Sequence, residues 1–212
     1  MRKERFAVGE YYHIYNRGVD HRSIVLDGGD SNRFVVALDL FNSTESVGSI
    51  KDFLDLPEMS RKSRGKPLVE LVCFCLNPNH YHLLLREIIP GGISRFMKRL
   101  GGYSYYFNLR HKRSGALFAG QFKAKRIQSN EHLVHLSSYI NLNNRVHKLS
   151  GPISRLVRSS WGEYTHDVNG LCTKNCILGQ FKNKNDYEKF ATDNLPHMIA
   201  KRVDYEELKN LD

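Results

Sequence analysis

The stretch Asn77-Pro78-Asn79-His80-Tyr81-His82-Leu83-Leu84-Leu85 places two histidines, separated by one bulky residue, in an apolar run. Alternate side chains of a β-strand point to opposite faces, so His80 and His82 would share one face while Tyr81 points to the other. Two imidazoles held side by side on a rigid strand can bind one metal ion. The same pair can also be a hydrogen-bonded feature of a surface or core, and the stretch alone does not decide between the two interpretations.

The neighbouring sequence predicts that these histidines open the second strand of a hairpin. Residues 68–76 are a nearly continuous apolar run with β-branched members, residues 80–87 are a second run, and the turn residues Asn77-Pro78-Asn79 join them. Residues 10–17 and 122–127 have the composition of two further strands. The chain therefore carries four predicted strands, of which the hairpin supplies the middle two.

Apolar residues at helical spacing predict two helices between these strands. The first begins near Asp30-Ser31, a good N-cap sequence, and the second near Ile93, with Gly101-Gly102 weakening it midway. Their apolar stripes are Phe34, Ala37, Leu38 and Phe41, then Phe96, Leu100, Tyr103 and Phe107. The order β-α-β-β-α-β is the ferredoxin-like split pattern, so we expect an α+β fold with an antiparallel sheet.

A third helix is predicted from Ser129-Asn130-Glu131 through about Asn144, and a mixed tail follows. Leu133, Leu136 and Ile140 can face the sheet, and an adjoining stripe carries His135, Tyr139 and Asn143 at successive i, i+4 positions. In the tail, Trp161 and Tyr164 are expected to pack back on the domain and Asp186 to Asp193 to form a short helix. We therefore predict one domain over residues 1–150, with this helix added to its C-terminal side, and an extension over residues 151–212.

The charge of the chain favours a polyanionic partner. Its 212 residues include 32 Lys and Arg against 22 Asp and Glu, a net charge of +10. Nucleic acid is the first candidate and an anionic membrane surface the second. No apolar run is long enough to span a bilayer and no signal-peptide core is present, which predicts a cytoplasmic protein without a membrane partner. Cys73, Cys75, Cys172 and Cys176 match zinc spacings poorly and are expected to stay reduced.

Basic and aromatic residues are interleaved between Arg95 and Arg126, where the chain has no Asp or Glu. Basic groups neutralise phosphates and exposed rings stack on unpaired bases, which indicates single-stranded or hairpin DNA. Tyr103 and Phe107 are expected in the core, and the loop cluster Arg61 to Lys66 is a further candidate for phosphate contact. The candidate DNA-binding residues are Arg17, Arg95, Lys98, Arg99, Tyr105, Tyr106, Arg110, Lys112, Arg113, Lys123, Lys125 and Arg126.

Four blocks of the sequence, taken in order over roughly residues 8–150, resemble the single-tyrosine HUH transposases. The branch they resemble is that of the REP-associated tyrosine transposases and their insertion-sequence relatives. The blocks are Tyr12-His13-Ile14-Tyr15-Asn16-Arg17-Gly18, Asn79-His80-Tyr81-His82-Leu83-Leu84, Gly115-Ala116-Leu117-Phe118-Ala119-Gly120-Gln121-Phe122-Lys123-Ala124 and Tyr139-Ile140-Asn141-Leu142-Asn143. The sequence departs from the family pattern at Asn144, where a proline is usual, and at Ala119, where a glutamine is usual.

The resemblance implies a metal-dependent DNA endonuclease and strand transferase. It makes His80, His82 and Asn143 ligands of a divalent metal, Mg²⁺ or Mn²⁺ with Zn²⁺ as a third option. It makes Tyr139 the nucleophile that forms a 5′-phosphotyrosine, with Tyr105 as the rival if Tyr139 is misplaced. In related enzymes the tyrosine helix packs on its own histidine strand or on a partner's, so a homodimer with a shared site stays open. The absent proline puts the length of that helix in doubt.

Two other functions are compatible with the residues. A catalytically silent hairpin-binding protein derived from such an enzyme would keep the charge and lose cleavage, and the departure at Asn144 motivates it. A metal-dependent RNA phosphodiesterase would use the histidine pair but leaves Tyr139 without a role.

Overall fold

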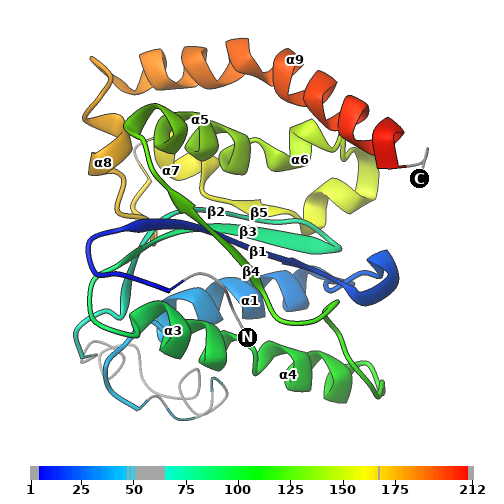
Figure 1. Ribbon diagram of the computed structural model, residues 1–212. Coiled ribbons are helices and arrows are strands. Elements are labelled where there is room, and N and C mark those ends of the chain that lie inside the picture. Colours follow the sequence, from blue (N-terminus) through cyan, green and yellow to red (C-terminus); the bar gives the residue numbers. More distant parts are fainter. Residues whose placement is uncertain (1–4, 47, 49, 51–64, 167, 210–212) are drawn as a thin grey trace.

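The structure, a computed structural model, describes residues 5–46, 48, 50, 65–166 and 168–209, with side chains as far as residue 202. Residues 61–64 of the predicted basic loop cluster lie outside this part of the chain. Figure 1 shows a central sheet with helices on both faces.

The sheet is antiparallel and has the strand order β4-β1-β3-β2-β5. Its strands are β1 (Tyr11–Arg17), β2 (Val69–Leu76), β3 (His80–Glu87), β4 (Lys123–Ile127) and β5 (Arg158–Ser159). The first four are the predicted strands, and their order 4-1-3-2 is the ferredoxin-like one. The prediction of an α+β fold is therefore confirmed, and the short strand β5 adds a pairing that was not predicted.

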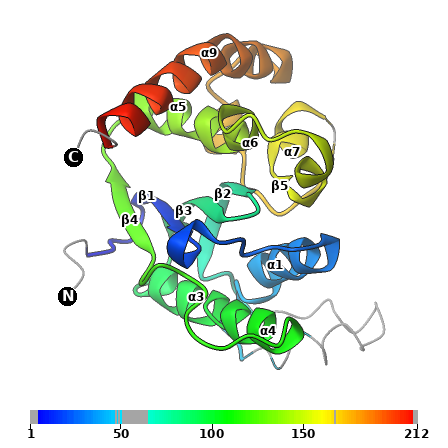
Figure 2. The same ribbon diagram turned by 90° about the vertical axis from the view of Figure 1, so that its right-hand side faces the viewer.

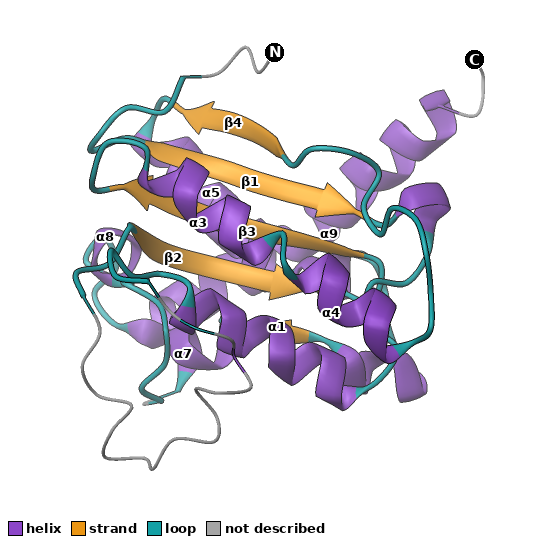
Figure 3. Cartoon of the chain, turned by 90° about the horizontal axis from the view of Figure 1, so that it is seen from below, coloured by secondary structure: helices purple, strands orange, loops and turns teal. Residues whose placement is uncertain are grey.

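Helices cover the two faces of the sheet in two separate groups. The first face, which Figure 3 shows toward the viewer, carries α1 (Gly28–Leu40), α3 (Gly92–Leu100) and α4 (Tyr103–Arg110). The opposite side holds α5 (Asn130–Asn141), α6 (Asn143–Val146), α7 (Trp161–Thr165), α8 (Asn175–Leu178) and α9 (Lys184–Lys209) (Figure 2). Single 3-10 turns span Val19–His21 and Gly151–Leu156. No helix in the described part of the chain is both long and apolar enough to cross a membrane.

Strand alternation divides the core between the two faces. Tyr81 and Leu83 of β3 pack with Phe34 of α1 and Phe96 of α3 in one buried cluster. Leu84 belongs to the other cluster, with Leu133, Leu136 and Ile140 of α5 as predicted. Because His80 and His82 share the alternation of Leu84, they lie on the α5 face, and Tyr81 points the other way.

Two helices on the first face differ in their boundaries from the prediction. The N-cap of α1 is Asp27, whose side chain accepts a hydrogen bond from the Asp30 amide, and Asp30 itself is buried in the first turn. The helix predicted from Ile93 is broken at Gly101-Gly102 into α3 and α4, and its stripe of Phe96, Leu100, Tyr103 and Phe107 is buried throughout.

The C-terminal helix is much longer than the predicted Asp186 to Asp193. Helix α9 has 26 residues and continues through Pro196. A proline removes one hydrogen bond from a helix, so a sequence pattern favours an end there. Packing compensates, because Tyr187 and Ala191 are completely buried in the α5-side cluster, together with Tyr164. Trp161 is partly buried against the same cluster, as predicted.

Candidate active site

Strand β3 places His82 beside a third histidine, His13 of β1. His82 pairs in register with Tyr15, and its side chain is almost completely buried. Nδ1 of His82 is hydrogen-bonded to Nε2 of His13 at 2.8 Å. A hydrogen bond at one ring nitrogen fixes the orientation of an imidazole and leaves the other nitrogen for a ligand. The His13 contact therefore leaves Nε2 of His82 as the nitrogen that can bind a metal.

His80 faces two amide oxygens, one on each side of its ring. Nδ1 lies 2.7 Å from Oδ1 of Asn79, and Nε2 lies 2.9 Å from Oδ1 of Asn143. A neutral imidazole carries one proton, so it can donate to only one of these oxygens. With that proton on Nδ1, the lone pairs of His80 Nε2 and Asn143 Oδ1 converge, an arrangement that a cation would stabilise.

The amide of Asn77 bridges the same two acceptor atoms. Asn77 Nδ2 donates to Asn143 Oδ1 at 2.7 Å and lies 3.0 Å from Nε2 of His80. Among the described residues, Nδ2 of Asn143 is buried without a hydrogen-bond partner. Two neutral imidazoles and an amide oxygen are donors that Mg²⁺, Mn²⁺ and Zn²⁺ accept. The donors of His80, His82 and Asn143 therefore fit the divalent metal that the sequence predicts.

Tyr139 lies against His82, in the same chain. Its ring centroid is 5.7 Å from that of His82, and the rings of His80 and His82 are 5.2 Å apart. Burial raises the pKa of the Tyr139 phenol above its usual 10, while the side chain of Asn143 and the charge of Arg202 act in the opposite direction. The predicted nucleophile is thus beside the predicted ligands, in a setting that disfavours its ionisation unless a cation is near.

A buried hydrogen-bond network holds α5 on the sheet. Tyr187 of α9 bonds through its hydroxyl to Ser137 at 3.2 Å and to Asn141 at 2.9 Å. Oδ1 of Asn141 accepts from Ser160 at 2.6 Å, and Ser160 Oγ accepts from the Phe74 amide of β2 at 2.9 Å. The extension after residue 150 therefore contributes to the position of the helix that carries Tyr139.

Helix α5 ends earlier than predicted. It stops at Asn141, and Leu142, with φ −102° and ψ 13°, separates it from α6, which starts at Asn143. The prediction of one helix through Asn144 was wrong in this detail, because the change of direction at Leu142 requires no proline. Asn143 still reaches His80, so the absent proline does not remove the contact. His135, predicted to align with Tyr139, instead packs on Phe190 of α9.

The histidines around the site are held in their neutral form. Burial lowers the pKa of His13 to about 4, helped by His132 and Lys125, and that of His147 to about 3, helped by His80 and Arg202. Burial also lowers the pKa of His80, and it lowers that of His82 strongly, with the other histidines adding to the effect. Neutral imidazole is the form that binds a metal.

Three residues of this site have no signal in the sequence that predicts their contacts. His13 reaches His82, His147 stacks on His80 with centroids 4.6 Å apart, and Asn77 bridges His80 and Asn143. His13 lies in one of the four family-like blocks, but only the register of β1 with β3 brings it to His82. Asn77 was interpreted as a turn residue.

Among the candidate DNA-binding residues, Arg17 of β1 and two lysines of β4 lie close to the histidines in the sheet. Lys123 pairs with Tyr15 and Lys125 with His13, so both lysines share the α5 face with His82. Arg17 pairs with His80 at the end of β1 and is exposed. Arg126 is ion-paired with Glu10 at 2.8 Å.

The other candidates lie on the α3 and α4 side of the sheet, and several bind to the protein itself. Arg99 donates to the carbonyls of Phe41, Ser43 and Glu45, Arg110 pairs with Asp27 and Asp30, and Arg113 bonds to Asn108. Arg95 bonds to the Thr44 carbonyl, while Lys98 and Lys112 are exposed. Tyr105 is 74% exposed, and Tyr106 is half-buried under Arg33. Helix α4 lies on the face away from the histidines, which argues against Tyr105 as the nucleophile (Figure 1).

A second group of side chains could hold a metal ion. In the described part of the chain, ligand atoms of Asp27, Asp30 and His111 lie within 4.8 Å of one another. Nε2 of His111 is 2.9 Å from Oδ2 of Asp30, and Arg110 pairs with both carboxylates. The guanidinium of Arg110 already supplies the positive charge there, so this group links α1 to α4. The sequence does not predict this group, because Asp27 and Asp30 resemble residues that start a helix and His111 is distant from them in the chain.

Comparisons with known proteins place the chain in a family. The family model for IS200-like transposases matches residues 51–168, which is more than half of the chain. Among solved structures, that of a REP-associated tyrosine transposase bound to a REP hairpin is similar to 77% of this chain and 83% of its own, with 13% identity and a TM-score of 0.49. No curated protein matches the sequence. The match over residues 51–168 shows that the chain belongs to the IS200-like transposase family.

Proposed function

We propose that this protein is a metal-dependent, single-strand DNA endonuclease and strand transferase, with Tyr139 as its nucleophile. One observation carries the proposal: within a single chain, Tyr139 lies against His82, and Asn143 Oδ1 lies 2.9 Å from Nε2 of His80. Membership of a transposase family supports the reaction class. The predicted Tyr139 on α5 and His80 and His82 on β3 are thus brought together from parts of the sequence about sixty residues apart.

The phosphodiester must be made electrophilic and the phenol must lose its proton. A divalent cation bound by His80, His82 and Asn143 would draw charge from the non-bridging oxygens of the phosphate. Tyr139 needs help to ionise, because burial raises its pKa. The charge of Arg202 lowers that pKa, and a divalent cation held by His80, His82 and Asn143 would lower it further.

The covalent step conserves the energy of the broken bond. The Tyr139 oxygen attacks the phosphorus, the bond to the 3′ oxygen breaks, and a free 3′-hydroxyl leaves with the proton. The 5′ end stays attached to Tyr139 as a phosphotyrosine. A second 3′-hydroxyl can then attack the same phosphorus and release Tyr139, which joins strands without ATP.

The experiment is an assay for a covalent adduct. We expect wild-type protein, incubated with a 3′-labelled hairpin DNA and Mn²⁺, to form a labelled, denaturant-resistant protein–DNA species. Tyr139→Phe should abolish it and Tyr105→Phe should not, since Tyr105 is exposed on the opposite side of the sheet. An adduct that persists in Tyr139→Phe would overturn the proposal. Hairpin binding with no adduct under any divalent metal would favour the silent DNA-binding protein.

A further inference from the structure

Two adjoining cavities lie between α3 and the segment Phe118–Phe122 that leads into β4. Their volumes are about 160 Å³ and about 440 Å³. Both are lined by Met97, Gly101, Gln121 and Phe122, so they form one continuous hollow, which we call the α3 slot. The slot lies on the sheet face away from His80 and His82, because its floor includes Tyr81.

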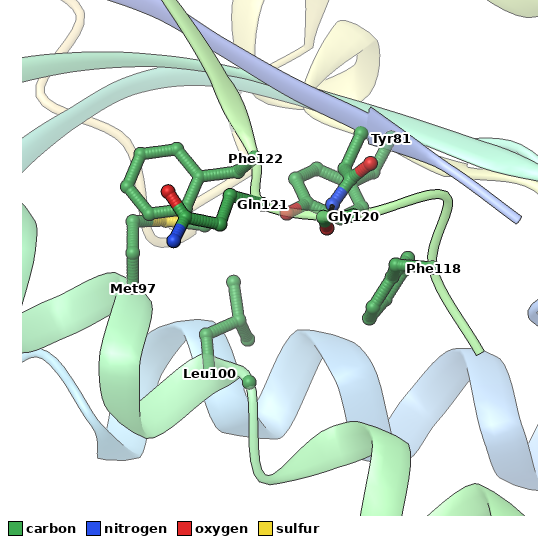
Figure 4. A pocket seen from close by; sticks show the side chains of 9 residues that line it. Tyr81, Met97, Leu100, Phe118, Gly120, Gln121 and Phe122 are labelled. Carbon is green, nitrogen blue, oxygen red and sulfur yellow. Dashed lines mark hydrogen bonds between the residues drawn. The ribbon is translucent and has the colours of Figure 1, made fainter. Parts of the chain in front are cut away.

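The side chains that line the slot are mostly apolar, and several are aromatic. Figure 4 shows the rings of Tyr81, Phe118 and Phe122 along one side, with Met97 and Leu100 projecting toward them from α3. Aromatic rings beside aliphatic side chains accommodate a flat aromatic ligand by stacking. The shape therefore suits one ring system rather than a segment of helix or strand.

A side-chain amide at the mouth of the slot is available to a ligand. The amide of Asn16 is already used, since it donates to the Gly120 carbonyl at 3.0 Å and accepts from the Arg17 amide at 2.9 Å. Gln121 is exposed at the mouth, and its side-chain amide makes no hydrogen bond to the described residues. A glutamine amide offers a donor and an acceptor, the combination that pairs with the edge of a base.

The charge around the slot points to a ligand that is attached to phosphates. Lys98 lines the wider cavity, and Lys123 directly follows Phe122. Neither lysine pairs with an acidic side chain in the described chain, and no Asp or Glu occurs between residues 95 and 126. An apolar aromatic slot with Lys98 at its rim, and with Lys123 and Lys125 at the β4 edge on the opposite face of the sheet, is compatible with single-strand DNA binding.

The sheet connects the slot to the candidate active site. Tyr81 faces the slot, while its chain neighbour His82 contacts Tyr139 on the opposite face of the sheet. Lys123 pairs with Tyr15, and Tyr15 pairs with His82, so Lys123 and His82 lie two strands apart, about 10 Å across the sheet. Strand β4 is at the edge of the sheet, where a DNA strand can pass from one face to the other.

From these contacts we infer that the α3 slot binds one unpaired nucleobase of the DNA strand that Tyr139 attacks. The strand would cross the β4 edge, with phosphates at Lys123 and Lys125 and the attacked phosphate at the histidines. This inference rests on the proposed function, and it adds a base-binding subsite on the opposite face of the sheet from the reaction.

Photocrosslinking tests the inference without a known target sequence. The probe is a DNA hairpin with a thymidine-rich single-stranded flank, in which every unpaired thymidine is replaced by 5-iododeoxyuridine. After irradiation of the complex, mass spectrometry locates the crosslinked residue. We expect crosslinks on Phe118, Phe122 or Tyr81 at the slot, and Tyr105, which is 74% exposed on α4, serves as an internal reference for non-specific stacking.

Matched variants separate the slot from general DNA binding. Met97→Trp should fill the slot, remove the crosslinks at Phe118 and Phe122, and weaken binding of the same DNA roughly tenfold, the loss of one stacked base. Met97→Leu, of similar volume, should leave both unchanged. Because Met97 is buried and its tryptophan variant can fail to fold, Gln121→Ala provides a second test at an exposed side chain. It should weaken binding about threefold to tenfold.

The outcomes distinguish this inference from the proposed function. Two results would refute base binding in the α3 slot even if the Tyr139 adduct forms. One is that crosslinks are confined to Tyr105, and the other is that a folded Met97→Trp variant binds DNA as the wild type does. Slot crosslinks without any adduct in the assay above would leave the subsite standing and refute the proposed reaction.

Discussion

His13 and His82 are the clearest case of one residue setting the chemistry of another. Their rings are joined at 2.8 Å through Nε2 of His13 and Nδ1 of His82, and both are neutral at neutral pH because burial lowers their pKa values. Only one proton lies between two neutral nitrogens, so the partner that donates it fixes the tautomer of the other. Strand alternation in the sequence predicts the shared face of His80 and His82, but not this contact, which depends on the register of β1 with β3.

Replacing His13 should weaken metal binding without affecting the fold. His13→Phe keeps a ring of similar size but removes the hydrogen bond to His82, and loss of a bond that orients a metal ligand costs about 10-fold to 100-fold in affinity. Titration calorimetry with Mn²⁺ measures this directly. Tyr15→Phe, on the same face of β1, is the matched control and should bind Mn²⁺ as the wild type does. An unchanged affinity in His13→Phe would show that His13 does not orient His82.

Asp27 should stabilise the protein at neutral pH and cease to do so in acid. Its hydrogen bonds from Arg110 hold the pKa of the Asp27 carboxyl below 3.8, so the stabilisation is present above pH 3.8 and is lost as the pH falls through the lowered value. The side chain is 45% exposed, and the expected effect is therefore only about 0.5 kcal/mol. Urea unfolding should show Asp27→Asn less stable than wild type at pH 7 and equal to it near pH 2. An equal difference at both pH values would contradict this origin.

Local pattern predicts most of the elements, and long-range packing determines the others. Strands β1 to β4 and helices α1, α3, α4 and α5 follow from alternation, helical spacing and turn residues. Strand β5 has two residues, and its pairing with β2 has no local signal. The length of α9 depends on burial of Tyr187 and Ala191 against α5 and α7, which outweighs Pro196. These contacts join residues that are distant in sequence, so the composition of residues 151–212 does not predict that they help to position α5, the helix that carries Tyr139.

Asn141 tests this link between the tail and α5. In Asn141→Leu, the buried hydroxyls of Tyr187 and Ser160 each lose one hydrogen bond, although Ser137 and Phe74 continue to bind them. We expect a loss of about 2 kcal/mol in the free energy of unfolding, measured by urea denaturation. Asn144→Ala, a half-buried neighbour, should change the stability by less than about 0.5 kcal/mol. Similar losses in both variants would argue against the network.

At the scale of the whole molecule, the net charge of +10 and the path across the β4 edge predict how DNA binding responds to salt. Several arginines predicted to bind DNA are engaged by the protein's own carbonyls and carboxylates, whereas Lys123 and Lys125 share the face of the histidines. Spacing along the chain could not separate these two classes, because the partners of Arg99 and Arg110 are distant in sequence.

Removing one β4 lysine should lower the salt dependence of binding. Each phosphate contact on single-stranded DNA contributes about 0.7 to the slope of log K against log[salt]. We therefore expect Lys123→Gln or Lys125→Gln to bind hairpin DNA with a flank more weakly and with a slope reduced by about that amount, in fluorescence anisotropy titrations. Lys189→Gln is the control, since Lys189 pairs with Asp193 on α9. An unaltered slope in both β4 variants would exclude a path over this edge.

The central claim is that one chain carries both halves of the active site, the histidine strand and the tyrosine helix. A mixing experiment tests it most directly. The variants Tyr139→Phe and His80→Ala, each inactive alone, are mixed under conditions that allow subunits to exchange. The mixture and the wild-type protein are then assayed for the covalent DNA adduct. We expect an adduct with wild-type protein and none with the mixture, because every chain in the mixture lacks one half of its own site. Adduct formation in the mixture would show that the two halves come from different chains, contrary to this account.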